Sequence, residues 1–291
     1  MKLIDSSKPT YKANFHTHTT ESDGLWTPEQ AMAAYRSLGY DILAITDHRR
    51  VTHPGPAPEG LLTIPGVELD MFVGHQAVHL LGLGVDDRVM EDFRREDGPQ
   101  KAIDLLHDHG GQVILAHPAW SLNTPDFIAS LKGLCAAEVW NSVSDIPYNA
   151  ARADSSCLLD VAAALGQVLP FAANDDTHFY GSELGRGATM VQADALTVPA
   201  VLEALQQGRF YASQGPRFHD VSLEAGQLHV RCTPADTIIF YSDLVWIEGR
   251  TIQGKDMTEA TYRLHQGEGF VRCQIIDRDG RSAWTSPVRC P

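Results

Sequence analysis

The chain has 291 residues, and its 23 Lys and Arg against 37 Asp and Glu side chains give a formal net charge of −14. This length fits one large α/β barrel or two ordinary domains, and 43% hydrophobic residues exclude a disordered or collagen-like chain. Residues 1–212 carry 14 basic and 27 acidic side chains, whereas residues 213–291 carry 9 and 10. Because an acidic surface repels phosphate backbones and anionic lipid, we expect neither long nucleic acids nor membranes as partners.

Residues 1–15 are polar and lack the apolar segment of a signal peptide. The segment that comes closest to a membrane span, residues 157–173, contains Asp160, Gln167 and Pro170 and is therefore unsuited to crossing a bilayer. The five cysteines include no CxxC pair, so we interpret them as reduced and mostly buried, with a Cys232–Cys273 disulfide as the less favoured alternative. We expect Cys157, on a helix, to lie in the core. Together these features predict a cytoplasmic protein.

The first two-thirds of the chain repeat a unit of helix, glycine, apolar strand and polar end. The first helix, residues 27–38, begins at Thr27 with Pro28 and a capping-box Gln30, and the strand 41–46 follows. Further apolar strands are expected at 62–68 and near 80–83. We expect more helices at 100–109, 124–133, 147–165 and 198–207, and strands at 112–116, 137–140, 169–173 and 209–212. Helices alternating with apolar strands indicate a parallel sheet, and this many units favour an α/β barrel with its active site at the strand ends.

The pattern changes after residue 212. Short strands are predicted at 221–223, 228–232, 238–241, 261–264 and 270–276, separated by Gly and Asp turns, with a hairpin turn at Asp279-Gly280. We therefore divide the chain into a barrel over residues 1–212 and a small β-sandwich-like, all-β domain over residues 213–291.

The strongest local signal for chemistry is His16-Thr17-His18, followed by Asp23. Side chains at i and i+2 on a strand share one face, so both imidazoles can bind one cation. An isolated pair of this kind would more often be two solvent-facing histidines. Further borderline or hard metal ligands, however, stand at other strand edges: His48, Glu68, His79, His117, Asp176 and His178. Asp175 competes with Asp176, and the i, i+2 spacing to His178 favours Asp176. Nine ligands suit two or three ions rather than one.

These motifs, namely HTHTTESDG, the AITDH run ending at His48, GVE ending at Glu68, AHP at His117 and DTH at Asp176–His178, resemble the polymerase and histidinol phosphatase (PHP) family. The resemblance covers roughly residues 12–212, and the segment 208–216 resembles the junction of two-domain members. It implies a distorted (β/α)7 TIM-like barrel that holds up to three divalent ions, here Mn, Zn or Fe. The implied ligand sets are His16, His18, Glu68 and Asp176 for the first ion; Glu68, His79 and His117 for the second; and Asp23, His48 and His178 for the third. Many relatives have His at the position of Asp23, and a carboxylate there favours Mn or Fe over Zn.

Such a centre predicts a hydrolase in which a water bridging two cations becomes the nucleophile, with Glu68, Asp176 and His178 as catalytic residues. Our first hypothesis is a phosphoesterase acting on a small, phosphorylated monoester or diester. The second is a carboxylic ester, amide or carbamate hydrolase with the same centre, and the third is a catalytically silent metal- or ligand-binding module. A GxSxG elbow and a Walker-type loop are both missing from the sequence, which gives no support to metal-free acyl transfer or NTP hydrolysis.

Candidate substrate contacts are polar residues near predicted strand ends. Arg186 is favoured because the glycines on both sides of it allow close approach of a ligand. Arg49 and Arg50 follow a predicted ligand and can reach a phosphate. The remaining candidates are Arg152, Asn141, His53 and Trp140. For each, a solvated charge or a packing role is the alternative interpretation.

Overall fold

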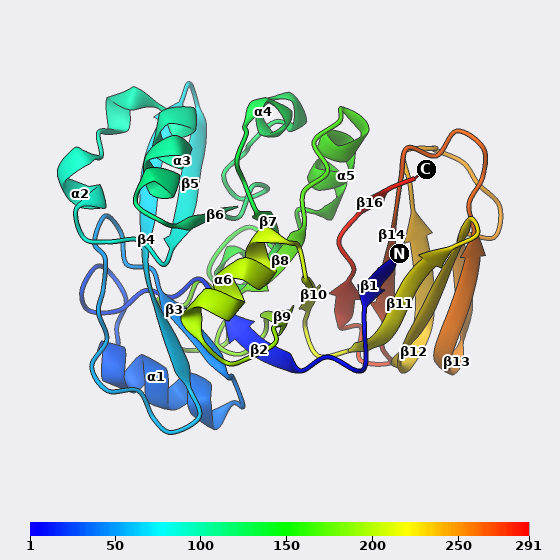
Figure 1. Ribbon diagram of the computed structural model, residues 1–291, viewed down its shortest axis with the longest axis horizontal. Helices are drawn as coiled ribbons and strands as arrows, with labels where there is room; N and C mark the ends of the chain where they lie inside the picture. The colour runs from blue at the N-terminus through cyan, green and yellow to red at the C-terminus, as the bar shows by residue number, and fades with distance from the viewer. Residues whose placement is uncertain (291) are drawn as a thin grey trace.

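The computed structural model describes residues 1–290. It is a mixed α/β structure in which helices α1 to α6 surround strands β2 to β10, while β11 to β14 form a strand-rich part beside them (Figure 1). The strands are β1 Lys2–Ile4, β2 Thr10–Asn14, β3 Ile42–Ile45, β4 Leu62–Val73, β5 Gln76–Leu83, β6 Gln112–Leu115, β7 Ala136–Asn141, β8 Phe171–Asn174, β9 Ala188–Gln192, β10 Phe210–Ser213, β11 Phe218–Glu224, β12 Gln227–Tyr241, β13 Thr251–Arg263, β14 Phe270–Ile276, β15 Ser282–Trp284 and β16 Val288–Arg289. The α-helices are α1 Pro28–Ser37, α2 Val89–Asp92, α3 Pro99–Asp108, α4 Pro125–Ser130, α5 Ser156–Ala164 and α6 Val198–Gln206.

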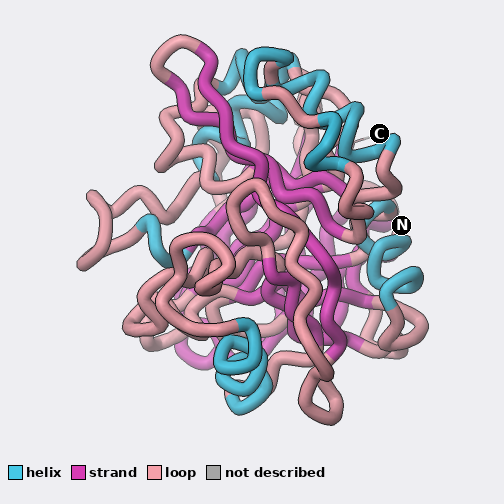
Figure 2. The backbone as a smooth tube through the Cα atoms, turned by 90° about the vertical axis from the view of Figure 1, so that its left-hand side faces the viewer, coloured by secondary structure: helices cyan, strands magenta, loops and turns pink. Residues whose placement is uncertain are grey.

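The sheet is mixed, so the expected (β/α)7 barrel is not confirmed. Strands β2, β3 and β4 run parallel, as do β6, β7 and β8, but β5 is antiparallel to both of its neighbours and β9 is antiparallel to β2 and β10. Only Gly74 and His75 separate β4 from β5, which is too short for a helical crossover and makes a hairpin. This hairpin projects from the body of the molecule (Figure 2).

Strands β8 and β9 are connected through a side chain. The Thr189 hydroxyl of β9 accepts from the Ala173 amide of β8 and donates to the Ala173 carbonyl, each at 3.1 Å. Beyond β8, Asp176 N donates to the His16 carbonyl at 2.9 Å, and His18 N donates to the Thr177 carbonyl at 3.0 Å. The segment after β8 therefore lies against the segment after β2, and their polar side chains share one site.

Local sequence signals account for helices α1, α3, α4 and α6, whereas α2 is not among the predicted helices and α5 is predicted only in part. The helix at 27–38 is confirmed as α1, with Thr27 and Gln30 forming the capping box. The helix expected at 147–165 is wrong over its first half, because α5 begins only at Ser156. In the preceding loop, Ser155 N donates to the Val139 carbonyl and Asn149 Nδ2 to the Val143 carbonyl, bonds that tie the loop to β7 and its following turn instead of to a helix.

The strand-rich part shares hydrogen bonds with the rest of the molecule. The predicted strands at 228–232 and 238–241 are one long strand, β12, and the hairpin turn at Asp279-Gly280 lies between β14 and β15. Strand β1 pairs with β11 and β15 pairs with β10, so one sheet crosses residue 212. The division into 1–212 and 213–291 stays a prediction.

All five cysteines are free, and Cys157 is exposed, so its predicted place in the core is wrong. The buried residues of α5 are Leu159, Ala162 and Ala163, which form one helical face, and Cys157 lies on the opposite face with Val161. No helix within residues 1–290 is both long and apolar enough to cross a membrane.

Candidate metal centre

The structure brings all nine predicted ligands into one cluster, in which seven follow the ends of strands and Glu68 and His79 lie within β4 and β5. Their ligand atoms form four overlapping groups, each within 4.8 Å: His18, Asp23, His48 and His178; His16, Glu68 and His117; His16, His18 and Asp176; and His48, Glu68 and His79. His16, His18 and Glu68 are almost completely buried, whereas Asp23 is exposed at the edge. Asp176 and His117 have positive φ angles of 54° and 29°, a backbone strain that often accompanies functional sites.

The positions of the ring nitrogens of His16 and His18 indicate whether a cation fits the centre. His16 Nδ1 lies 2.9 Å from Glu138 Oε1, which assigns the ring proton to Nδ1 and leaves a lone pair on Nε2. That Nε2 is 3.2 Å from His18 Nε2 and 3.1 Å from Asp176 Oδ1, and this buried oxygen has no hydrogen-bond partner. Lone pairs that converge in a buried site are stabilised by a shared cation, so the residues present fit a metal ion.

Glu68 stands at the middle of the cluster and can bridge two ions. Its Oε1 lies 2.8 Å from His79 Nδ1 and 3.3 Å from His117 Nε2. Its Oε2 lies 3.1 Å from both His18 Nε2 and His48 Nδ1. The two oxygens thus face different histidine sets, as a bridging carboxylate requires.

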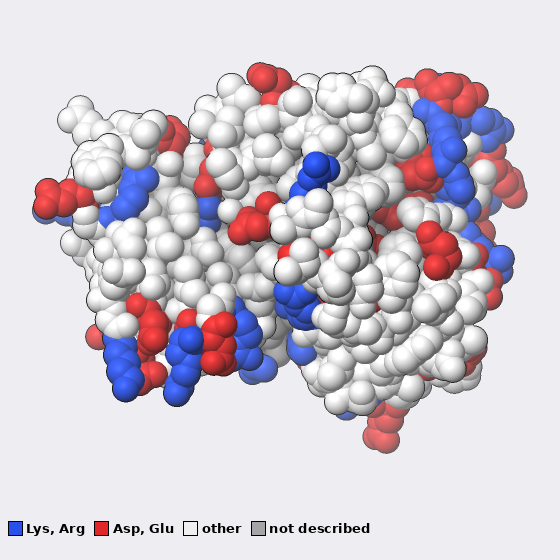
Figure 3. All heavy atoms as spheres, turned by 180° about the vertical axis from the view of Figure 1, so that it is seen from behind, with Lys and Arg blue, Asp and Glu red and all other residues white. Residues whose placement is uncertain are grey.

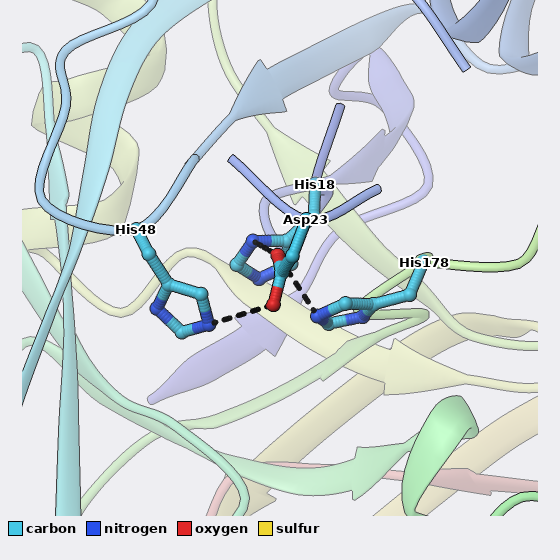
Figure 4. Close-up of side chains that lie close together, drawn as sticks. All are labelled: His18, Asp23, His48 and His178. Carbon is cyan, nitrogen blue, oxygen red and sulfur yellow. Dashed lines mark ion pairs between the residues drawn. The ribbon is translucent and has the colours of Figure 1, made fainter. Parts of the chain in front are cut away.

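Asp23 approaches three histidines from the open side of the cluster (Figure 4). Its Oδ1 lies 3.5 Å from His18 Nδ1 and from His178 Nε2, and its Oδ2 lies 3.8 Å from His48 Nε2. The loop that carries Asp23 packs closely on the segment that follows β2, since a Cβ on Gly24 would lie 2.3 Å from the His18 carbonyl oxygen. Only glycine fits at that position without moving the backbone.

Electrostatic coupling in the cluster is strong. Burial disfavours a charged His18, but hydrogen bonds and attraction from Asp176 and Glu68 outweigh it and raise the pKa of His18 to about 10. Burial likewise opposes ionisation of Glu68, yet His16 and His79 hold the pKa of Glu68 well below its usual range. Protons on the histidines thus neutralise the ionised carboxylates, and a bound metal ion would replace those protons and free the ring lone pairs.

A buried carboxylate that the motifs did not single out supports the centre. Glu138 in β7 contacts His16, and its Oε2 accepts from the His117 amide at 2.9 Å and from Asn141 Nδ2 at 2.8 Å. Its Oε1 also accepts from Asn174 Nδ2 at 2.9 Å. The available signal was an acidic residue within the apolar strand Ala136–Trp140.

Asp175 points away from the cluster and anchors the loop 181–187. Its carboxylate accepts from the amides of Gly185, Arg186 and Gly187, from Ser142 Oγ and from Tyr35 OH, at 2.7 to 3.1 Å. Burial raises the pKa of Asp175 to about 6 despite these bonds. The structure thus places Asp176, and not Asp175, among the clustered groups.

The candidate substrate contacts lie outside the pocket at the centre. Arg49 pairs with Asp70, Arg50 with Glu21, and Arg186 with Asp145. Asn141 is buried behind the cluster, where its Nδ2 donates to Asp176 Oδ2 at 3.2 Å. The others lie apart as well: Arg152 is exposed, His53 pairs with Asp87, and Trp140 packs on Trp284.

The pocket itself has a volume of about 260 Å³ and is open to solvent. Besides seven of the clustered residues, it is lined by Trp120, Val143, Ser144, Asn149 and Phe179. Trp120 packs edge-on against His117, and the half-exposed Phe179 stacks on Tyr148. Within residues 1–290, no Lys or Arg lines this pocket.

Comparisons with known proteins agree with this architecture. A two-domain protein from Bacteroides vulgatus, described as containing a predicted PHP-like metal-dependent phosphoesterase, superimposes with a TM-score of 0.56 and 19% identity over 98% of this chain and 96% of that one. The chain has a PHP-like fold. The resemblance seen in the motifs is thereby confirmed, although no family model matches the chain.

Two curated proteins also match part of this PHP-like chain. The 5'-3' exoribonuclease Rnm of Escherichia coli is 36% identical over 80 residues, which cover 25% of this chain and 27% of Rnm. Rnm of Salmonella typhimurium is 36% identical over 89 residues, or 28% and 30% of the two chains. The chain thus spans less than a third of the length of these relatives. Since both are named exoribonucleases, the expectation that long nucleic acids are not partners is not confirmed.

Proposed function

We propose that this protein is a metal-dependent phosphoesterase. The proposal rests on the positions of three buried atoms. His16 Nε2, His18 Nε2 and the unpartnered Asp176 Oδ1 lie within 3.2 Å of one another. These atoms lie beside Glu68, whose two carboxylate oxygens face different histidines, and the cluster opens into a pocket. The names of the PHP-like neighbour and of Rnm agree with phosphoester hydrolysis.

The ligand sets that we propose are those that the family resemblance implies, and they match the four groups of the cluster only in part, since His117 groups with His16 and Glu68 while His79 groups with His48 and Glu68. His16, His18, Glu68 and Asp176 would hold one ion, Glu68 with His79 and His117 a second, and Asp23 with His48 and His178 a third. We propose two or three divalent ions of Mn, Zn or Fe. Bound ions supply Lewis acidity toward phosphoryl oxygens and lower the pKa of water so that hydroxide can attack at neutral pH.

The chain's own residues set the protonation of the ligands. Glu138 keeps the proton of His16 on Nδ1, and the Asp176 carbonyl, 2.8 Å from His178 Nδ1, does the same for His178. The Nε2 atoms of both rings therefore face the cluster as acceptors. In this arrangement His178 acts in catalysis as a ligand, together with Glu68 and Asp176, and does not donate a proton from Nε2.

The pocket favours a substrate that presents one phosphate to the centre. Without Lys or Arg in its lining, the pocket leaves the neutralisation of phosphate charge to the cations. Trp120 and Phe179 offer apolar surface for the organic part of the substrate. We propose a small phosphomonoester or phosphodiester as the substrate.

A second candidate is hydrolysis at the end of an RNA strand, which the 36% identity with Rnm favours. Only the terminal nucleotide would need to enter the pocket. The net charge of −14 opposes the approach of the rest of the strand and predicts a strong dependence on salt and divalent ions.

The test is a substrate panel assayed with Mn, Zn and Fe: small phosphomonoesters, a small phosphodiester, a 5′-phosphorylated RNA oligonucleotide, a carboxylic ester and a carbamate. The variant His117→Ala removes a proposed ligand, and His229→Ala, at a partly exposed histidine of β12 outside the cluster, is its control. We expect phosphoester hydrolysis to fall by roughly 100-fold or more in His117→Ala and to be unchanged in His229→Ala.

Each other outcome of the panel has a defined meaning. Phosphatase activity that survives His117→Ala contradicts the assigned centre. Activity confined to the carboxylic ester or carbamate replaces the phosphoesterase proposal with that of an acyl hydrolase. Metal binding without turnover of any substrate indicates a silent binding module.

A further inference from the structure

A second pocket lies at the junction between the sheet's β9–β10 region and residues 213–217. This junction pocket has a volume of about 80 Å³, and its lining includes three cationic side chains, those of Lys12, Arg186 and Arg217. No acidic side chain of residues 1–290 lines it. On the face drawn in Figure 3, Lys and Arg side chains are visible beside the indentation between the two parts of the molecule. Such a grouping is unexpected in a protein of net charge −14.

Lys12 lacks a counter-ion even though its side chain is partly buried. Its ammonium forms no ion pair with any residue in 1–290; Nζ lies 3.1 Å from the Leu38 carbonyl and 3.8 Å from the centre of the Tyr40 ring. Burial lowers the pKa of Lys12, and although Asp175 opposes this shift, Arg217 adds to it. The ammonium therefore bears a desolvation cost and a repulsion that a bound anion would relieve.

The two arginines complete the cationic side of the pocket. The Arg217 side chain has no ion-pair partner in the described chain, and it extends from a backbone held by Thr233 at 2.9 Å. Arg186 pairs with Asp145 at 2.8 Å, a residue outside the pocket lining. The amides of Gly185, Arg186 and Gly187 are already bonded to Asp175. Side chains, and not a backbone nest, would therefore bind a ligand here.

We propose that the junction pocket binds inorganic phosphate. The cations of Lys12 and Arg217, which form no ion pair within residues 1–290, match a doubly charged oxyanion that accepts several hydrogen bonds, whereas the Arg186 guanidinium is already paired with Asp145. Its volume of about 80 Å³ has room for a small oxyanion such as the free ion. The pocket shares no lining residue with the metal-centre pocket, so this site does not depend on the proposed phosphoesterase activity.

The test is calorimetric titration of inorganic phosphate into the full chain at constant ionic strength, with chloride as the competing background ion. Titrations are run on metal-loaded protein and on protein from which metal and chelator have been removed. Phosphate binding that survives metal removal belongs to a site outside the metal centre. We expect Lys12→Met and Arg217→Ala each to weaken this binding by roughly tenfold.

The control is Arg263→Ala, which removes an exposed arginine of β13 without altering the pocket. Its phosphate affinity should equal that of the wild type. Because Arg217 is exposed, Arg217→Ala keeps the test valid if Lys12→Met folds poorly. Equal affinity in wild type, Arg217→Ala and Arg263→Ala would overturn the proposal, as would the absence of phosphate binding to the metal-free wild type.

Discussion

The Glu138 carboxylate lies 2.9 Å from Nδ1 of His16, and neither side chain is exposed to solvent. The same carboxylate holds the His117 amide and the side chains of Asn141 and Asn174. One buried acid thus orients groups at the ends of β2, β6, β7 and β8. Such partners fix the tautomer and the orientation of a ligating histidine.

Glu138→Gln is expected to weaken metal binding by roughly 10- to 100-fold. The amide keeps the size of the side chain but removes the charge that keeps the His16 proton on Nδ1. The measurement is metal bound per chain as a function of free metal concentration, with the exposed Glu259→Gln as control. Unchanged affinity in Glu138→Gln would show that Glu138 does not position His16.

Asn141 acts as a positioning residue in this account, since it bonds to Glu138 and Asp176 and is absent from the pocket lining. We expect Asn141→Ala to lower kcat by roughly tenfold and to leave KM within a factor of two. Steady-state kinetics on the best substrate of the panel measure both constants. A rise in KM at constant kcat would instead identify Asn141 as the substrate contact that the sequence predicts.

Arg272 of β14 connects the strand-rich part to helix α5. Its guanidinium is 1% exposed, donates twice to Asp160 at 2.6 Å and lies 3.8 Å from the centre of the Tyr241 ring. Asp160→Asn leaves this buried cation without its counter-charge, and we expect a loss of about 3 kcal/mol in the free energy of unfolding. Urea denaturation measures the loss. Replacing both partners, as in Asp160→Leu with Arg272→Met, should recover most of it; a double variant no more stable than Asp160→Asn would contradict this explanation.

The N-terminal strand supplies a prediction of pH dependence. Hydrogen bonding to Lys2, 2.8 Å away, lowers the pKa of Asp220 to about 2 against the opposing effect of burial. A carboxyl whose pKa is lower in the folded chain stabilises the fold above its unfolded value near 4, and this contribution is lost as the pH falls through about 2. Lys2→Met should return the Asp220 pKa toward its usual value, which NMR titration can follow. An unchanged pKa would assign the shift to the Ser6 contacts alone.

The motifs located most of the cluster because seven of the nine ligands follow a strand, a place that local sequence reveals; Glu68 and His79 instead lie within β4 and β5, which extend beyond the predicted strands. His16 and His18 share a face by their spacing, and the structure places them within 3.2 Å. The sequence did not reveal the antiparallel β5 or the strand β9, because a strand's direction depends on its partner and not on its own residues.

Contacts that depend on the tertiary structure could not be predicted from the sequence either. Glu138 looks like an ordinary acid in the sequence, and only the neighbouring strands give it His16 as a partner. Arg186 was favoured as a substrate contact for its glycine neighbours, but Asp175 folds those glycines into a separate loop that faces the junction pocket. The assignment of individual ligand and substrate roles, the separate barrel domain and the cytoplasmic location stay predictions.

The central claim is that the clustered His, Asp and Glu side chains hold a multinuclear metal centre. It is tested most directly by the metal content per chain after equilibration with Mn, Zn or Fe and removal of free metal, measured by elemental analysis. The account predicts two to three ions per chain, with thermal stability raised by the bound metal. Less than one ion per chain under these conditions would contradict it.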